Sequence, residues 1–141
     1  MHISSRLLGD LDVPLDRVLD FPEGLVGFPD RFRFARIPSG PQSPFESLIS
    51  MDDPELAFSV GDPVRLVPGY APPREEAAAA LQAQLADVCF LALLVIPEDV
   101  RDTTINLSAP LAIDQRRRLG RQLLVADPNV DAAVRVFRIA R

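Results

Sequence analysis

The sequence predicts a mainly β fold: a compact, single-domain, barrel-like sheet over residues 1–141, with one or two short helices. Three observations lead to this prediction. The chain has 141 residues, which is enough for one domain with a sizeable core. Its 14 prolines are scattered from Pro14 to Pro128, and proline interrupts long helices because it lacks a backbone donor. Short stretches of apolar, β-branched and aromatic residues recur between turn-forming residues, as in a sheet or barrel.

These short stretches are the predicted strands. In chain order they are residues 31–37, 56–60, 64–67, 88–96, 103–107, 111–114, 121–125 and 134–139. Residues 31–37 (RFRFARI) and 134–139 (VRVFRI) alternate arginine with apolar residues over much of their length. Such alternation predicts strands with one buried and one exposed face. Residues 88–96 (VCFLALLVI) do not alternate, which predicts a central strand buried on both sides.

One helix is predicted over residues 74–85. Two prolines precede it, and Glu75 and Glu76 fall in its first turn, where the helix dipole favours negative charge. Leu81 and Leu85 lie one turn apart and give the helix a narrow apolar face. We expect this face to pack against the sheet.

Composition and charge exclude several classes of protein. The net charge is −5 and the sequence pI is about 4.8, which argues against direct nucleic-acid binding because that function needs a field of positive charge. The single cysteine, Cys89, rules out an internal disulfide. The first residues lack the layout of a secretory signal, and the longest apolar run is about half the length that spans a bilayer. We therefore expect a cytoplasmic protein that does not enter membranes.

The chain also lacks the residues of common catalytic sites. Its only histidine, His2, lies beside a chain end, which makes it a poor general base. Cys89 lies in the most apolar segment with no adjacent histidine or lysine, and we expect an inert thiol in the core. No zinc-ligand set, Ser-His-Asp triad or phosphate-binding glycine motif can be assembled. The sequence therefore predicts a protein that is not an enzyme and that binds no cofactor or metal.

Acidic residues form two groups. They are Asp52, Asp53 and Glu55 in the first group and Glu98, Asp99 and Asp102 in the second. Neither group has the spacing of an EF-hand. Each can be a turn in which aspartate bonds its own backbone, or a surface that binds a partner. The residues alone leave both interpretations open.

The basic residues are concentrated at residues 116–118, three consecutive arginines. The predicted strands at 111–114 and 121–125 flank them like the arms of a hairpin, which predicts a solvated loop. Because the chain is acidic overall, we do not expect this loop to contact RNA.

Four segments of the chain resemble motifs of the FliW family of flagellar assembly factors, in the same order and at similar spacing. They are FPEGLVGFPD at residues 21–30, PFESLISMDDPELAFSVGDP at 44–63, TTINLSAPLAID at 103–114 and GRQLLVAD at 120–127. Two positions depart from the family's usual pattern, which has Gln where this chain has Ile49 and commonly Tyr where it has Val130. Either difference alters partner contacts if the residue is exposed.

The resemblance implies a β-rich, barrel-like domain with two antagonistic protein partners. One is flagellin, bound before its export, and the other is CsrA, the small translational repressor of flagellin synthesis. When flagellin leaves the cell, the free protein would capture CsrA and release the flagellin message for translation. No catalysis and no cofactor are implied.

Partner binding of this kind would depend on an acidic surface that steers a basic partner. The candidate partner-binding residues are Asp52, Asp53, Glu55, Asn106 and Ser108. For Asn106 the alternative is an amide that bonds a neighbouring loop backbone. We expect a monomer when no partner is bound. Alternative functions are a flagellar chaperone or adaptor for other protein partners, or a small enzyme of an unrecognised type.

Overall fold

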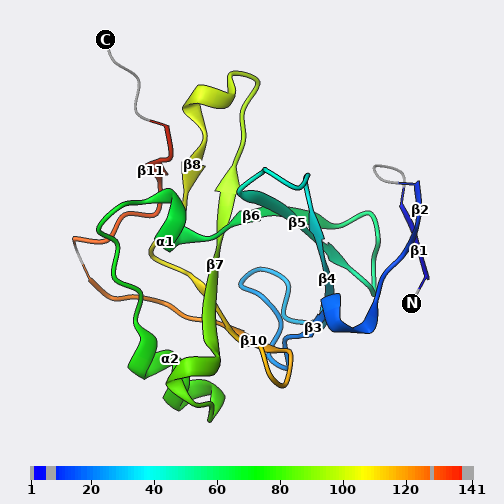
Figure 1. The fold of residues 1–141 in the computed structure, drawn as a ribbon, viewed down its shortest axis with the longest axis horizontal. Helices are drawn as coiled ribbons and strands as arrows, with labels where there is room; N and C mark the ends of the chain where they lie inside the picture. The colour runs from blue at the N-terminus through cyan, green and yellow to red at the C-terminus, as the bar shows by residue number, and fades with distance from the viewer. Residues whose placement is uncertain (1, 6–8, 128, 138–141) are drawn as a thin grey trace.

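The chain folds into a closed barrel of seven strands (Figure 1). The computed structural model describes residues 2–5, 9–127 and 129–137. The barrel strands are β3 (Val18–Asp20), β4 (Arg33–Pro38), β5 (Phe45–Ser50), β6 (Ala57–Gly61), β7 (Val88–Val95), β9 (Leu111–Asp114) and β10 (Leu119–Gln122). Their order is β9-β10-β3-β4-β5-β6-β7, and the pairing of β7 with β9 closes the ring. This confirms the predicted mainly β, barrel-like fold.

Smaller elements extend or cover the barrel. β1 (His2–Ser5) and β2 (Gly9–Asp12) form a separate two-stranded sheet, while β8 (Thr104–Ile105) and β11 (Val134–Arg135) extend β7 beyond the ring. The described residues also form the helices α1 (Pro63–Leu66) and α2 (Arg74–Leu81) and the 3-10 helices η1 (Leu15–Arg17), η2 (Leu85–Asp87) and η3 (Val100–Asp102). In this described part, no helix has the length and apolar character needed to cross a membrane.

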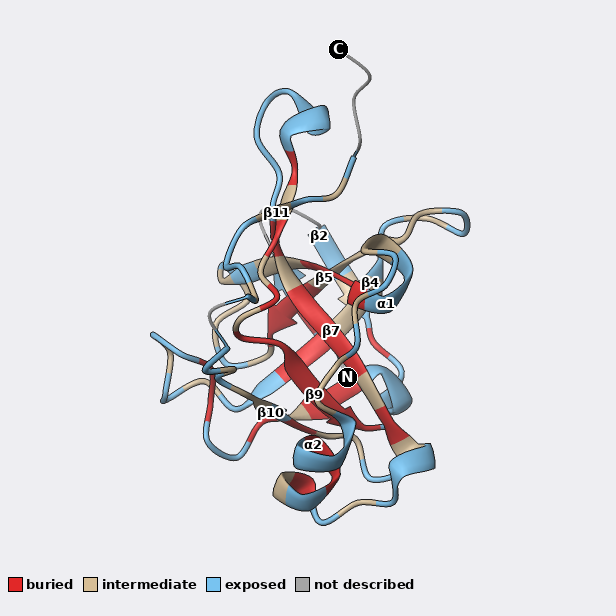
Figure 2. Cartoon of the chain, turned by 90° about the vertical axis from the view of Figure 1, so that its left-hand side faces the viewer, coloured by how far each residue is buried: buried red, intermediate tan, exposed pale blue. Residues whose placement is uncertain are grey.

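β7 is the central strand of the barrel. Residues 88–91 pair with β9 and residues 94–95 with β8 along one edge, while residues 92–93 pair with β6 along the other. β7 is buried along most of its length (Figure 2). Phe90 and Leu91 are both buried, although consecutive residues of a strand point to opposite faces. Leu91 belongs to the cluster inside the barrel, and Phe90 packs under α2. The absence of alternation in this segment therefore did predict a strand covered on both faces.

The loop between β3 and β4 plugs one end of the barrel (Figure 1). Phe21 and Leu25 of this loop are buried in the interior cluster together with Phe34 and Leu48.

Gly24 permits the fold of this loop. Its φ is +69°, and a Cβ there would lie 2.6 Å from the carbonyl oxygen of Phe28. The segment FPEGLVGF thus contributes Phe21 and Leu25 to the core.

α2 is shorter than predicted. It begins at Arg74 as expected, but it ends at Leu81 because Gln82 adopts the left-handed conformation, with φ of 53°. Residue 85 instead begins the 3-10 helix η2. The buried side of α2 packs against β7 and β9 through Ala77, Ala78 and Leu81.

The strand predicted at residues 64–67 is wrong, because these residues form α1. The Asp62 carboxylate accepts a hydrogen bond from the Val64 N–H at 2.9 Å, and Pro63 occupies the first turn.

Other strand boundaries also differ from the prediction. β10 ends at Gln122, so the predicted strand at 121–125 lies too late in the chain. Only Val134–Arg135 form β11 from the predicted strand at 134–139, of which residues 138–139 lie outside the described residues. β1, β2, β3 and β5 were not predicted.

Replacing Gly120 on β10 by alanine should destabilise the barrel. An added Cβ would lie 2.4 Å from Cε1 of Phe21, which is fully buried and packs edge-on against Phe34. Relieving this overlap requires the plug to move, at a cost of about 1–3 kcal/mol in the free energy of unfolding. Urea denaturation measures the loss. Gly40→Ala is the control because a Cβ there meets no atom within 4 Å, and equal stability of the two variants would contradict the predicted overlap.

Candidate functional site

The open end of the barrel carries polar side chains on positions that face its interior. Alternate residues of a strand share a face. Phe34 and Leu48 fill the interior, so Arg36 on β4 and Glu46 on β5, each two residues nearer the open end, point the same way. Cys89 on β7 packs against the same interior cluster. The barrel therefore has an apolar middle and a charged end.

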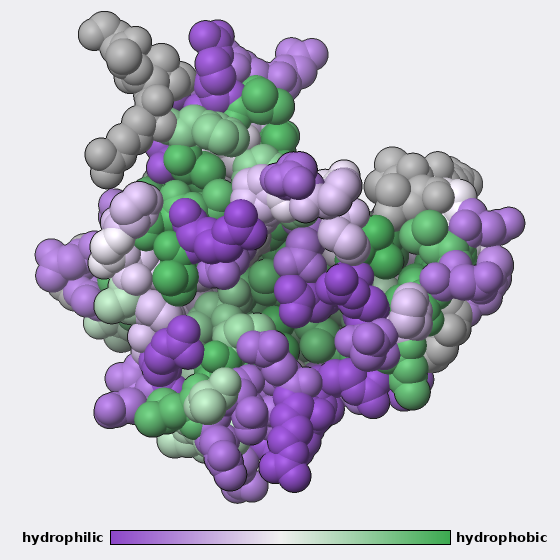
Figure 3. Space-filling view, viewed as in Figure 1, coloured by the Kyte–Doolittle hydropathy of each residue, from purple (hydrophilic) through white to green (hydrophobic). Residues whose placement is uncertain are grey.

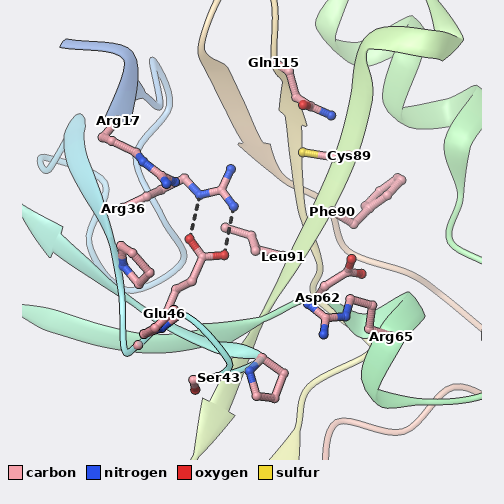
Figure 4. A pocket seen from close by; sticks show the side chains of 14 residues that line it. Arg17, Arg36, Ser43, Glu46, Asp62, Arg65, Cys89, Phe90, Leu91 and Gln115 are labelled. Carbon is pink, nitrogen blue, oxygen red and sulfur yellow. Dashed lines mark hydrogen bonds and ion pairs between the residues drawn. The ribbon is translucent and has the colours of Figure 1, made fainter. Parts of the chain in front are cut away.

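These side chains line a cavity of about 510 Å³ (Figure 4). We call it the barrel mouth and define it by its charged or ionisable residues Arg17, Arg36, Glu46, Asp62, Arg65 and Cys89. The loop at residues 38–44 adds three prolines to its wall. In the space-filling view, hydrophilic residues surround apolar surface near the centre of the molecule (Figure 3). The volume lies within the range of roughly 300–1,000 Å³ that is usual for ligand pockets.

An ion pair between Arg36 and Glu46 joins β4 to β5 in the barrel mouth (Figure 4). Arg36 Nε donates to Glu46 Oε1 at 3.1 Å, and Nη2 donates to Oε2 at 2.8 Å. The two side chains are only 22% and 17% exposed. Burial alone would lower the pKa of Arg36, but the hydrogen bonds and the charge of Glu46 outweigh burial and raise it. The two charges of this pair therefore neutralise each other.

Cys89 lines this mouth and is half-buried, whereas its apolar neighbours predicted full enclosure in the core. Burial raises the pKa of its thiol, and the positive charge of Arg36 opposes the rise. A thiol with a raised pKa is a weak nucleophile at neutral pH. Among the described residues, no three or more histidine, cysteine, aspartate or glutamate side chains are grouped so that they could hold a metal ion.

Arg17 and Arg65 bring two further positive charges to the barrel mouth. Arg17 lies in η1, just before β3, and Arg65 lies in the last turn of α1. Both residues are exposed, and neither guanidinium has a hydrogen bond or ion pair with any other described residue. The nearby carboxylate of Asp62 instead caps α1. The mouth thus presents two guanidinium groups that have free donors.

The predicted residues Asp52, Asp53 and Glu55 lie together in the turn between β5 and β6, at the plugged end. Asp52 Oδ2 accepts hydrogen bonds from the Phe32 N–H at 3.0 Å and from the next N–H at 3.4 Å. Asp53 Oδ1 accepts from the Glu55 N–H at 3.3 Å. Asp52 therefore ties the turn to the start of β4, whereas Asp53 shapes the turn itself and also pairs with Arg31 at 3.8 Å. Asp52 and Glu55 are also exposed, and their role in partner binding stays a prediction.

The predicted residues Asn106 and Ser108 lie in a different turn, after β8, on the other side of the molecule (Figure 1). Asn106 Oδ1 accepts hydrogen bonds from the Ser108 N–H at 2.9 Å, the Ser108 hydroxyl at 2.8 Å and the Ala109 N–H at 3.2 Å. Its amide oxygen thus has the loop-bonding role that we gave as the alternative. Contact of either residue with a partner stays a prediction.

The three arginines at residues 116–118 do lie between the arms of a β9–β10 hairpin. They are not simply solvated, however. Arg117 donates to Asp114 and to the Leu81 carbonyl oxygen, which ties the hairpin to α2. Arg118 donates to the Leu15 carbonyl oxygen. Two of the three therefore brace neighbouring segments.

Sequence reasoning missed the barrel mouth, although one signal was present. In residues 31–37 the alternation breaks at Arg36, which shares a face with Phe34 and not with Arg33. An arginine on the apolar face of a strand indicates either a buried ion pair or a polar site. The residues that complete the mouth come from distant segments, and only the fold brings them together.

The chain is similar to proteins of one family over most of its length. The family model described as FliW protein matches residues 2–136. A flagellar assembly factor FliW from Symbiobacterium thermophilum is 36% identical over 116 residues, which cover 80% of this chain and 84% of the relative. Another from Natranaerobius thermophilus is 32% identical over 128 residues, covering 89% and 85%. A crystal structure of the flagellar assembly factor FliW matches with a TM-score of 0.85 at 27% identity and covers 99% of both chains.

The two departures from the usual family pattern differ in their exposure. Ile49 is completely buried on β5, so this side chain cannot touch a partner of the folded protein. Val130 is half-buried and packs beside β8 and β11. Of the two, only Val130 can alter a contact surface.

Replacing Asp114 by asparagine should lower stability in a pH-dependent way. Burial alone would raise the pKa of Asp114, but hydrogen bonds from the Arg117 side chain and from two backbone N–H groups hold it below its usual value. A lowered native pKa contributes stability above the unfolded value of about 4, and this contribution is lost as pH falls through the native pKa. Asp114→Asn should therefore cost about 1–3 kcal/mol at pH 7 and progressively less below about pH 4.

Chemical denaturation of both proteins across this pH range measures the difference. Asp16→Asn is the control, since Asp16 is exposed and has no hydrogen bond or ion pair within the described chain. A stability loss for Asp114→Asn that does not change with pH would contradict the predicted role of the charge.

Proposed function

Because the chain belongs to the FliW family, we propose that it is a non-catalytic regulator of flagellar assembly with two protein partners. It binds flagellin and, when free of flagellin, binds and antagonises the translational repressor CsrA, which relieves repression of flagellin synthesis. The observation that carries the proposal is the family match over residues 2–136. Relatives and a solved structure that share the name flagellar assembly factor FliW support it.

The charge of the chain supports a basic partner. A repressor that binds RNA must present positive charge to the phosphates, and this chain has a net charge of −5. The exposed carboxylates of Asp52 and Glu55 lie in one turn, fixed in place by backbone hydrogen bonds around them. A rigid acidic surface of this kind accelerates encounter with a basic protein.

The positions of the reactive side chains support a non-catalytic role. His2 is exposed on β1, with Nδ1 3.4 Å from Asp12 Oδ1. Burial raises the pKa of the Cys89 thiol, which keeps it protonated. Neither residue supplies the activated nucleophile or base of a hydrolytic enzyme.

The proposed site of action is the cytoplasm, where flagellin is held before export, and the proposed free form is a monomer. The chain would act on the flagellin message only through CsrA. We propose no direct contact with nucleic acid or membrane and no cofactor.

Isothermal titration calorimetry tests the proposed partners. The purified chain is titrated with CsrA, first alone and then after saturation with flagellin. We expect saturable binding of CsrA to the free chain and strongly reduced binding to the flagellin-loaded chain. If the folded chain binds neither protein, the regulatory function is wrong and an adaptor for other partners takes its place.

Neutralising Asp52 and Asp53 together should slow association with CsrA. Asparagine keeps a side-chain oxygen that can accept the turn's hydrogen bonds, so Asp52→Asn, Asp53→Asn removes charge with little change of shape. Exposed charges act mainly on encounter, and we expect a rate constant about two- to tenfold lower with a flatter dependence on salt. Stopped-flow measurements at two ionic strengths determine both quantities.

The matched control is Glu75→Gln, Glu76→Gln, which removes two exposed charges from the first turn of α2. An equal slowing in both double variants would assign the effect to net charge alone. An unchanged rate constant and salt slope for the Asp52 and Asp53 variant would leave these residues as turn formers only.

A further inference from the structure

We propose that the barrel mouth binds a side-chain carboxylate carried by an acidic segment of a protein partner. The inference deepens the protein-binding function proposed above and rests on it for the class of partner. It concerns the end of the barrel opposite the acidic β5–β6 turn, because β5 runs from Phe45 at the mouth to Ser50 at that turn.

The first observation is the pair of arginines with free donors. In the close-up view, Arg17 and Arg65 lie on opposite sides of the Arg36–Glu46 ion pair (Figure 4). Arg36 is occupied by Glu46, whereas the other two guanidinium groups have no partner among the described residues. Guanidinium groups bind carboxylates through paired, charge-assisted hydrogen bonds. An incoming carboxylate can therefore use Arg17 or Arg65 without breaking an existing bond.

The second observation is the charge balance, which favours a carboxylate over a phosphate group. Three arginines and the two carboxylates of Glu46 and Asp62 line the mouth, which leaves an excess of one positive charge. A phosphate dianion would be repelled by both carboxylates in a partly desolvated space, where charge interactions are stronger than in water. A single carboxylate matches the excess charge. A nucleic acid would need a continuous basic track, which this acidic chain does not offer.

The third observation is that the remaining lining suits a polypeptide. The Ser43 hydroxyl accepts from the Phe45 N–H at 3.1 Å and keeps its own hydrogen free to donate. Gln115 offers an amide at the rim. Leu91 and the prolines of residues 38–44 supply apolar surface. The mouth therefore combines charged groups that can hold an acidic side chain with apolar surface that can contact the adjoining peptide.

An NMR titration of the full, ¹⁵N-labelled chain tests this site. The probe is the capped peptide acetyl-GSEGESG-amide, and its neutral counterpart has glutamine in place of both glutamates. We expect saturable shift changes that cluster at residues 17, 36–46, 62–65 and 115 with the acidic peptide only. Arg17→Gln and Arg65→Gln should each weaken binding about two- to fivefold.

Arg116→Gln is the matched control, because it removes one exposed guanidinium outside the mouth that has no side-chain partner in the described chain; it should leave binding unchanged. Equal binding of the neutral peptide, or shifts that cluster elsewhere, would overturn the proposal. The proposal would also be overturned if inorganic phosphate displaced the peptide at a lower concentration than acetate does. Binding only of an uncapped neutral peptide, through its terminal carboxylate, would overturn it as well.

The peptide titration can fail without contradicting the proposed regulatory function. Variants at Arg17 and Arg65 are titrated with CsrA and flagellin in parallel with the peptide. If both proteins bind the original chain normally while the acidic peptide does not bind it, the mouth proposal fails and the regulatory function stands. A weaker affinity of either protein for the Arg17→Gln or Arg65→Gln variant, but not for Arg116→Gln, would identify which partner carries the acidic segment.

Discussion

The pairing of β7 with β9 is the constraint on which the rest of the molecule depends, because it turns a curved sheet into a closed barrel. Cys89 pairs with Ile113 and Leu91 with Leu111, so two segments about twenty residues apart are held in one register. That register sets which side chains of β7 and β9 face the interior. It also fixes α2, whose buried alanines pack over the outer face of this same strand pair.

Closure gives the barrel two ends of different chemistry. The loop after β3 fills one end with Phe21 and Leu25, and the acidic β5–β6 turn is bonded to the backbone beside it. At the other end the interior positions hold Arg36 and Glu46. A partly buried ion pair costs desolvation free energy that an apolar pair would avoid. A contribution to stability therefore does not explain why this ion pair is present. The proposed binding of a partner's carboxylate beside this ion pair would give the polar end a function.

The fold was more predictable from the sequence than the site. The unbroken apolar run of β7 predicts a central strand because burial on both faces removes the need for alternation. The strand predicted at residues 64–67 was wrong because the apolar pattern of four residues does not reveal that Asp62 and Pro63 start a helix there. Short strands such as β3 were not predicted because three residues are too few to show a hydrophobic periodicity. The barrel mouth could not be predicted because Arg17, Arg36 and Arg65 line one cavity only through long-range pairing.

The proposed function requires this chain to relieve repression by CsrA and flagellin to cancel that relief. Cell-free translation of a CsrA-repressed flagellin message, with the purified chain added in steps, tests this claim most directly. We expect translation to recover as the chain approaches the concentration of CsrA, and we expect added flagellin protein to abolish the recovery. Translation that stays repressed with excess folded chain, or a recovery that flagellin leaves unchanged, would contradict it.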